Sequence, residues 1–200
     1  MREATSYTNN SATKIGRGAF YDWVSLVLVN CPNVTSIGAN AFNACTALKE
    51  IIFPSVTYIN NNAFRQCSAL ESIYLPEATT IQSSFSLCTK LKSVTLPKIE
   101  AIDNGTFYGC TSLETIEFPT SFTRILRQNC FYNCSALTKL VLPYAGVVSL
   151  ASANNLTGTP FASGQGHIYV HPNYVNSYKT ATNWSQFASV ITSMEEMDDE

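Results

Sequence analysis

Apolar residues recur along this chain with a period of about 22 residues, in the same order in six copies. Each copy has a leucine six residues after a phenylalanine, and a proline twelve residues after it. The phenylalanines are Phe20, Phe42, Phe64, Phe85, Phe107 and Phe131. A fixed period in the twenties with an L-x-x-I-x-L pattern is typical of a leucine-rich solenoid. Because each unit buries its apolar face against its neighbours, we predict one elongated domain.

The copy from Asn40 to Ile59 indicates how each unit folds. Two residues before the phenylalanine, every copy has Gly, Asn or Ser, which are favoured at a helix N-cap, so we expect a short helical turn there. The alternation of apolar residues after the leucine indicates a short strand, which the proline ends. The predicted strands are Ile51–Phe53, Ile73–Leu75, Val94–Leu96, Ile116–Phe118 and Leu140–Leu142. The fold class is therefore an α/β repeat solenoid, a right-handed superhelix with a parallel sheet on one face and helical turns on the other.

The repeats resemble the BspA-like leucine-rich repeat family, which occurs on the surfaces of bacteria and some parasitic protozoa. The resemblance rests on IGANAF at residues 37–42, CTAL at 45–48 and IYLP at 73–76, and it extends over about Ile15 to Pro143. It implies a leucine-rich-repeat fold and a cell-surface or secreted protein. Members are typically adhesins or host-protein binders, so the resemblance also implies a non-enzymatic binding module.

The pattern divides the chain into four parts. Residues 1–14 form a polar segment, a linker or partial cap, and residues 15–143 contain the six repeats. Residues 144–194 form a degenerate repeat and a C-terminal cap, and residues 195–200 an acidic tail. The first fourteen residues have no apolar stretch of a secretory signal, so the protein stays inside the cell or its leader is missing; the resemblance favours the second alternative.

Two features define the predicted cap. Residues 168–170 continue the strand pattern as a seventh strand, which would place Tyr169 in the outward column. From Asn173 to Met194, apolar residues spaced by three and four predict two short amphipathic helices, broken near Asn183. Solenoids need such atypical ends to cover the last rung of the core. The acidic run after these helices is expected to be frayed.

Five of the seven cysteines occupy one column of the repeat, three residues after the phenylalanine. Cys31 and Cys130 also take apolar positions, so we expect all seven to be buried, reduced thiols that act as small hydrophobic residues. Neighbouring rungs lie about 4.8 Å apart, and disulfides within the column remain geometrically possible.

Catalytic and metal-binding motifs are missing from the sequence. Gly16-Arg17-Gly18 lacks the third glycine of a nucleotide-binding loop, and no zinc, phosphate-loop or nucleophile-elbow motif occurs. His167 and His171 are the only histidines, and on one strand they would lie about 13 Å apart, too far for one metal. We therefore expect no enzyme activity, no metal and no cofactor.

Charge and hydropathy exclude two classes of partner. The net charge is −2, but five acids lie in the last six residues, so the rest of the chain carries about +3. This charge is too small and too scattered for nucleic-acid binding. No apolar run reaches the roughly 18 residues that cross a bilayer, so we expect no membrane insertion.

The remaining candidate for function is the outward face of the predicted sheet, eight and ten residues after each phenylalanine. Side chain types vary there, as in a contact surface or a solvated face, and Tyr74 and Ile52 are the best anchors. The candidate residues are Glu50, Ile52, Ser72, Tyr74, Ser93, Thr95, Thr115, Glu117, Lys139, Val141 and Tyr169. We interpret this face as a surface that recognises a host protein or a glycan. The alternative is a structural or attachment component of a larger surface or phage-tail assembly, with the repeats as a spacer.

Overall fold

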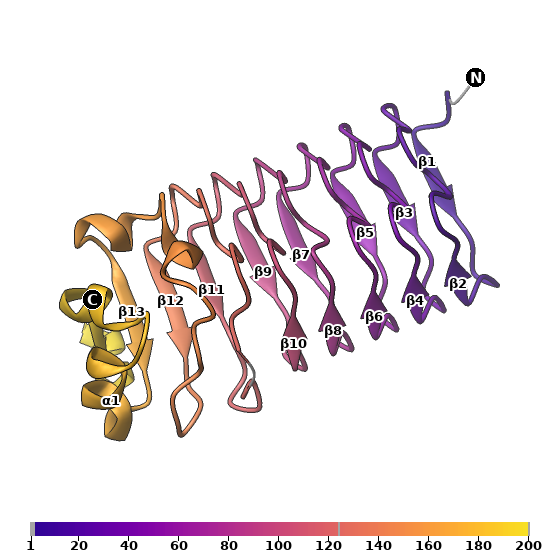
Figure 1. The fold of residues 1–200 in the computed structure, drawn as a ribbon. Helices are drawn as coiled ribbons and strands as arrows, with labels where there is room; N and C mark the ends of the chain where they lie inside the picture. Colours follow the sequence, from indigo (N-terminus) through magenta and orange to yellow (C-terminus); the bar gives the residue numbers. More distant parts are fainter. Residues whose placement is uncertain (1–2, 124, 200) are drawn as a thin grey trace.

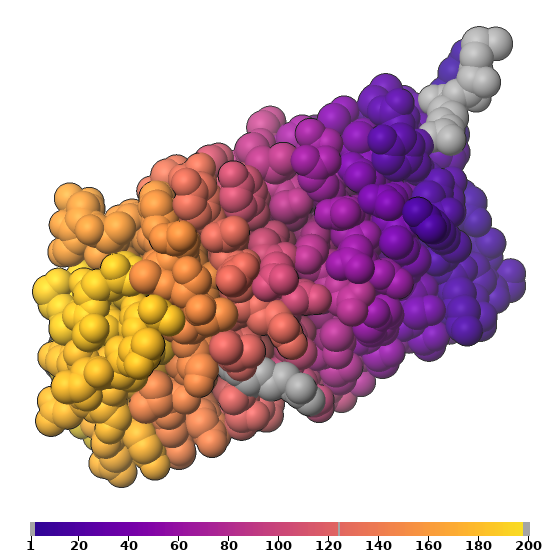
Figure 2. Space-filling model, viewed as in Figure 1, coloured from indigo at the N-terminus to yellow at the C-terminus, as the bar shows by residue number. Residues whose placement is uncertain are grey.

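The protein is elongated, and its repeats stack as rungs from one end to the other (Figures 1 and 2). The computed structural model describes residues 3–123 and 125–199. From residue 6 to residue 102 the chain runs through the same sequence of strand, bend, strand and turn in each rung, so equivalent residues form columns along the stack (Figure 1). Most helical residues lie at the C-terminal end.

A first row of strands contains the predicted ones. It is formed by β1 (Ser6–Thr8), β3 (Leu28–Asn30), β5 (Glu50–Ile52), β7 (Ser72–Tyr74), β9 (Ser93–Thr95), β11 (Thr115–Glu117), β12 (Lys139–Leu142), β13 (His167–Val170) and β14 (Ile191–Ser193). All pairings in this row are parallel, as predicted, although most strands begin one residue earlier than expected. The hydrogen-bonded ladder is interrupted between β5 and β7 and between β9 and β11.

The seventh strand has the expected register, because Ile168 pairs with Leu140 and Tyr169 with Val141. At the other end, the polar N-terminal segment extends the stack by one rung. Its β1 pairs with β3, and the Tyr7 ring lies 4.7 Å from the ring of Phe20.

A second row of two-residue strands was not predicted. It comprises β2 (Lys14–Ile15), β4 (Ser36–Ile37), β6 (Tyr58–Ile59), β8 (Thr80–Ile81) and β10 (Ala101–Ile102), again all parallel. The isoleucine of each strand points into the core and is buried. A single parallel bridge between Leu126 and Leu150 lies beyond β10. The fold is therefore a stack with two rows of parallel strands and few helices.

The turns before and after each phenylalanine are not helical, which corrects the expected helical turns. The residues interpreted as N-caps have left-handed backbone: Gly18, Asn40, Asn62, Ser83, Gly105 and Asn129 have φ between 40° and 62°. Alternate N–H groups bond to the next rung instead of along a helix. The Phe42 N–H donates to the Ala63 carbonyl (2.7 Å), and the Ala44 N–H donates to the Arg65 carbonyl (2.8 Å). The turns are thus a third hydrogen-bonded row.

The described helices follow the repeats. They are η1 (Ala153–Leu156), η2 (Pro160–Ser163), η3 (Pro172–Tyr174), α1 (Val175–Thr180), η4 (Ser185–Val190) and η5 (Met194–Asp199). Two short helices, α1 and η4, lie on either side of Asn183, whose φ is 65°. The acidic run was expected to be frayed; its residues Met194–Asp199 form η5, which contacts β13 and β14.

The core consists of columns of identical side chains. The repeated phenylalanine rings stack nearly parallel, with centroids 4.9–6.0 Å apart along the column. The cysteine column lies beside them, and each thiol bonds to the phenylalanine carbonyl of the preceding repeat. The Cys67 Sγ, for example, lies 3.2 Å from the Phe42 oxygen. All seven cysteines are buried, as expected.

Candidate binding face

The outward face of the first strand row presents most of the predicted site residues to solvent. Along β5, β7, β9 and β11 the strands alternate between an exposed and a buried side chain, because successive residues point to opposite faces of a sheet. The side chains that are exposed are Glu50, Ser72, Tyr74, Ser93, Thr95, Thr115 and Glu117. Ile52 and Lys139 are half-buried. The structure therefore brings these residues together on one surface.

Val141 and Tyr169 do not belong to this exposed surface, although they were predicted to. Val141 is fully buried and Tyr169 is 1% exposed. The Nζ of Lys139 lies 5.3 Å from the centre of the Tyr169 ring, and η5 contacts the strand that contains Tyr169. The outward column is correctly in register here, but both side chains are buried, and η5 packs against the strand that contains Tyr169.

The position of Glu196 shows that η5 lies on the outward side of the sheet. Thr192 pairs with Tyr169 across β13 and β14, so their side chains share a face. The pKa of the Glu196 carboxyl is lowered by a hydrogen bond from the Thr192 side chain, and by one from the Ser193 N–H (3.3 Å). The accessible part of the face therefore ends near β12.

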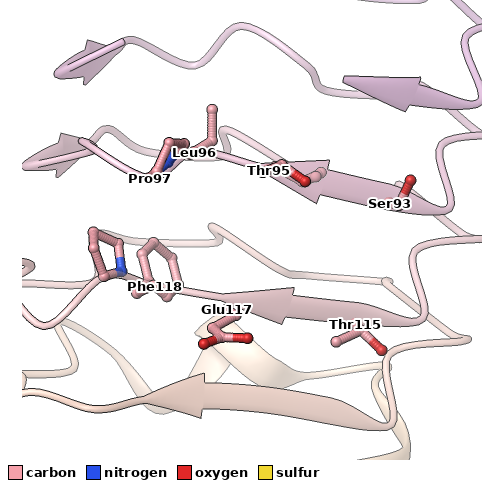
Figure 3. Close-up of a pocket in the computed structure, with 9 residues that line it drawn as sticks. Ser93, Thr95, Leu96, Pro97, Thr115, Glu117 and Phe118 are labelled. Carbon is pink, nitrogen blue, oxygen red and sulfur yellow. The ribbon is translucent and has the colours of Figure 1, made fainter. Parts of the chain in front are cut away.

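A groove of about 420 Å³ opens on this face between β9 and β11 (Figure 3). Ser93 and Thr95 line one side, Thr115 and Glu117 line the other, and Pro97 lies at one end (Figure 3). The groove lies where the hydrogen-bonded ladder between the two strands is interrupted. Three short hydroxyl side chains leave the space open, and the Glu117 carboxylate adds one negative charge and a strong acceptor.

Tyr74 lies next to this groove. Its strand pairs with β9, which places Tyr74 beside Thr95, and 62% of the tyrosine is exposed. A large exposed aromatic side chain provides contact area with little loss of conformational freedom, which makes tyrosine frequent among the residues that dominate binding energies. The groove and Tyr74 together offer an aromatic surface, hydroxyl groups and one carboxylate.

A column of alternating charge borders the face, one residue before the outward strand positions. Lys49, Glu71, Lys92 and Glu114 occupy successive rungs and are exposed. Adjacent rungs lie about 4.8 Å apart, so opposite charges are neighbours and the column carries no net charge. This edge therefore does not attract a strongly charged partner over a long range. Specificity for a partner must come from contacts on the face itself.

The cysteines and histidines of the described residues are not arranged as a reactive cluster. Burial raises the pKa of the Cys88, Cys130 and Cys134 thiols to about 12, and a thiol with such a pKa is a poor nucleophile at neutral pH. The two histidines point to different partners: His167 lies against Tyr169, and His171 Nδ1 accepts a hydrogen bond from the Asn173 N–H. Within residues 3–123 and 125–199, no group of three metal-ligating side chains occurs.

Sequence reasoning missed the groove itself. The sizes of the outward residues were a usable signal, since three of the four on β9 and β11 are Ser or Thr and follow the large Tyr74. The interruption of the ladder was not predictable from the repeat, because the strand pattern is the same on both sides of it.

No helix among the described residues has the length and apolar character required to cross a bilayer. None of the curated proteins matches this sequence.

Several solved structures are similar. A leucine-rich repeat protein of T. pallidum has a TM-score of 0.70 and 27% identity over 78% of this chain and 77% of its own. A leucine rich cell surface protein of Faecalibacterium prausnitzii has a TM-score of 0.62 and 37% identity over 68% of this chain. A Bacteroides ovatus leucine-rich repeat protein has a TM-score of 0.50 at 22% identity over 84% of this chain, a similarity of fold alone. The matched regions span 38% of the F. prausnitzii protein and 56% of the B. ovatus protein.

The sequence profile described as a BspA type leucine rich repeat region matches residues 5–84 and 78–154, in six copies. These matches cover most of the chain and include every phenylalanine of the repeat. The chain belongs to the BspA-type leucine-rich repeat family.

Proposed function

We propose that this protein is a non-enzymatic binding module of a cell-surface or secreted protein, and that it recognises a host protein or glycan through the outward sheet face. The family indicates a protein-interaction module, and a similar structure is that of a cell-surface protein. The observation that carries the proposal is the exposed Tyr74 beside the groove between β9 and β11. Tyrosine is enriched among the residues that dominate interface energies, and a concave surface beside it gives a partner further contact area.

The test is capture of matrix proteins, serum proteins and glycans by the immobilised protein. Tyr74→Ala combined with Ile52→Ala should weaken capture about tenfold, because it removes the aromatic and aliphatic contacts of the face. The melting temperature should not fall by more than a few degrees, since Tyr74 is mostly exposed and Ile52 is only half-buried. Tyr21→Ala is the matched control, as this tyrosine is half exposed and lies on a turn rather than on the sheet. Equal capture by all three proteins would contradict the proposal.

The second candidate is a structural or attachment role in a larger surface or phage-tail assembly, with the repeats as a spacer. The elongated stack favours it, because nine parallel strands in the first row set the two ends far apart (Figure 1). Absence of binding to every host protein and glycan tested would favour this function over recognition.

Two features of the architecture belong to the same proposal. We infer that the stack is a right-handed superhelix, because parallel strand connections are right-handed in about 98% of cases.

We also propose that residues 144–194 serve as a C-terminal cap beyond the six repeats of residues 15–143. Residues 1–14 precede the repeats, and the acidic residues 195–200 follow the cap. The buried Tyr178, Trp184 and Phe187 support the cap, since they cover the last rung.

A further inference from the structure

The turn side of the stack contains a second hollow, away from the sheet face. Its volume is about 290 Å³, at the lower end of the range for small-molecule sites. It extends over four repeats and is lined by Asn62, Arg65, Ser83, Ser86, Leu87, Asn104, Gly105, Tyr108, Gln128 and Asn129. Four of these side chains are amides, and one is a cation.

The hollow has two causes that can be read from the repeat. The turn column one residue after the phenylalanine contains, in order, Tyr21, Asn43, Arg65, Ser86, Tyr108 and Tyr132, and Ser86 is its smallest member. The spacing from Phe64 to Phe85 is also one residue shorter than the usual 22, and the missing residue falls in the turn at Ser83. A small side chain and a shortened turn therefore coincide and leave a gap. Arg65 and Tyr108 face this gap from rungs that are two apart, a distance of about 10 Å.

The groups around this gap are held in place. Tyr108 stacks on Tyr132 with ring centroids 5.3 Å apart and an interplanar angle of 4°, and 36% of it is exposed. The Asn104 Oδ1 accepts a hydrogen bond from the Gln128 N–H (3.1 Å). The Arg65 guanidinium donates to the Gln66 Oε1 (3.3 Å) and forms no ion pair with any described carboxylate. Tyr108, Asn104 and Arg65 thus each have a neighbouring group that orients the side chain.

Its electrostatic character is positive. Arg65 is the one charged residue in the lining. Asp103, next to Asn104 in the sequence, accepts a hydrogen bond from the Asn104 N–H, and its carboxylate lies 3.6 Å from the Nε of Arg127. Arginine binds a carboxylate through two parallel N–H groups, which lysine cannot reproduce.

We propose that this hollow binds a carboxylated pyranose, that is, an acidic sugar residue of a glycan. The Arg65 guanidinium receives the carboxylate, the amide side chains hydrogen-bond the ring hydroxyls, and the Tyr108 ring packs against an apolar face of the sugar. The volume of about 290 Å³ is of the size that one or two sugar residues occupy. This site is independent of the sheet face. The positive charge of Arg65 and the amide side chains of the lining determine which ligand it takes.

The experiment measures binding of free sugars to the whole protein by isothermal titration and ligand-observed NMR. The probes are glucuronate, galacturonate and N-acetylneuraminate, with glucose and acetate as matched controls that lack the carboxylate and the ring respectively. We expect at least one acidic sugar to bind at least tenfold more tightly than both controls. Comparison of the uronates with N-acetylneuraminate then identifies which kind of acidic sugar the site takes.

Two variants test the position of the site. Arg65→Gln should weaken binding at least tenfold, and Ser86→Tyr should abolish it, because this column already contains tyrosine in three other rungs and the ring would fill the gap. Arg17→Gln removes the same charge from an exposed turn outside the hollow and should leave binding unchanged. Tyr74→Ala should also leave it unchanged, which separates this site from the sheet face.

Three results would overturn the proposal. They are no binding of any acidic sugar, binding of acetate as tight as that of the sugars, and unchanged binding by a folded Arg65→Gln variant. Circular dichroism melting of each variant establishes that the protein tested is folded.

Discussion

Single residues act in this protein as members of columns. The phenylalanine rings stack on one another, and the cysteine thiols donate to the phenylalanine carbonyls of the preceding rung. The same two contacts therefore recur from rung to rung along the molecule. The thiol suits its position because it is small, apolar and still a weak donor. Substitution in one rung therefore disturbs contacts in two neighbouring rungs.

Phe85→Ala should lower the free energy of unfolding by about 3–5 kcal/mol, the usual range for emptying a buried aromatic site. Phe85 is fully buried, and its ring lies 5.2 Å from that of Phe64 and 6.0 Å from that of Phe107. Urea unfolding measures the change. Val24→Ala, at a position 55% exposed, is the control and should change stability by less than about 1 kcal/mol. Equal effects of the two substitutions would show that the phenylalanine column does not determine stability.

The buried thiols also predict a loss of stability at alkaline pH. Burial raises the pKa of Cys88 from 9.0 to about 12 in the folded protein, whereas the unfolded chain ionises near the ordinary value. Below pH 9 both states keep the proton, so stability is unaffected; between pH 9 and 12 only the unfolded state loses it. Each such thiol then lowers the free energy of unfolding by about 1.4 kcal/mol per pH unit.

Urea unfolding under reducing conditions at pH 7, 8.5, 9.5 and 10 measures this dependence. A Cys88→Ala variant should start less stable and lose stability less steeply above pH 9, because it has one such thiol fewer. A free energy of unfolding that stays constant from pH 7 to 10 would contradict the burial of the cysteine column.

At the level of elements, the longer strands were predictable and the turns were not. The alternation around Ile73 and Val94, followed by a proline, gives the strand position to within one residue. The two-residue strands such as Tyr58–Ile59 are too short for a periodic pattern to reveal. In the turns, Gly, Asn and Ser are favoured at helix N-caps, but Gly and Asn also adopt left-handed backbone, and residue type alone does not separate the two.

On the candidate face, too, some features were predictable from the sequence and others were not. Its outward residues, such as Tyr74 and Glu117, follow from the period of two along each strand. The burial of Val141 and Tyr169 did not follow. That of Tyr169 depends on η5 folding back over β13, and an acidic run gives no apolar signal of such a contact.

Substitutions at Gly105 distinguish a left-handed turn from an N-cap. Its φ is 62°, and a Cβ there would meet no atom closer than 3.6 Å, so backbone strain alone decides the outcome. Gly105→Ala should destabilise the protein by about 1–2 kcal/mol. Gly105→Asn should cost much less, since Asn adopts this backbone at Asn40 and Asn62. Thermal unfolding measures both, and equal losses would contradict the role of left-handed backbone in the turns.

At the level of the whole molecule, the two ends of the stack differ. At the N-terminal end, β1 and β2 have one paired neighbour each among the described strands. At the C-terminal end, the chain turns back and binds the last rungs through side chains. The Val148 N–H donates to the Tyr178 hydroxyl (2.9 Å), the Trp184 Nε1 donates to the Val148 carbonyl (2.7 Å), and the Asn183 amide donates to the Leu150 carbonyl (2.8 Å).

Removal of residues 173–200 should therefore destabilise the protein or cause it to aggregate. The deletion takes away three buried aromatic side chains and leaves the outer edge of β13 without its partner β14. An apolar core and an open strand edge would then face solvent, and both favour association. A shorter deletion, of residues 194–200, removes η5 alone and should expose Tyr169 while the core aromatic residues stay covered, so a smaller loss is expected. Melting temperature and light scattering compare the two. If the longer deletion melted as high as the intact protein, the stack would be stable with its last rung open, and residues 173–193 would not be a cap.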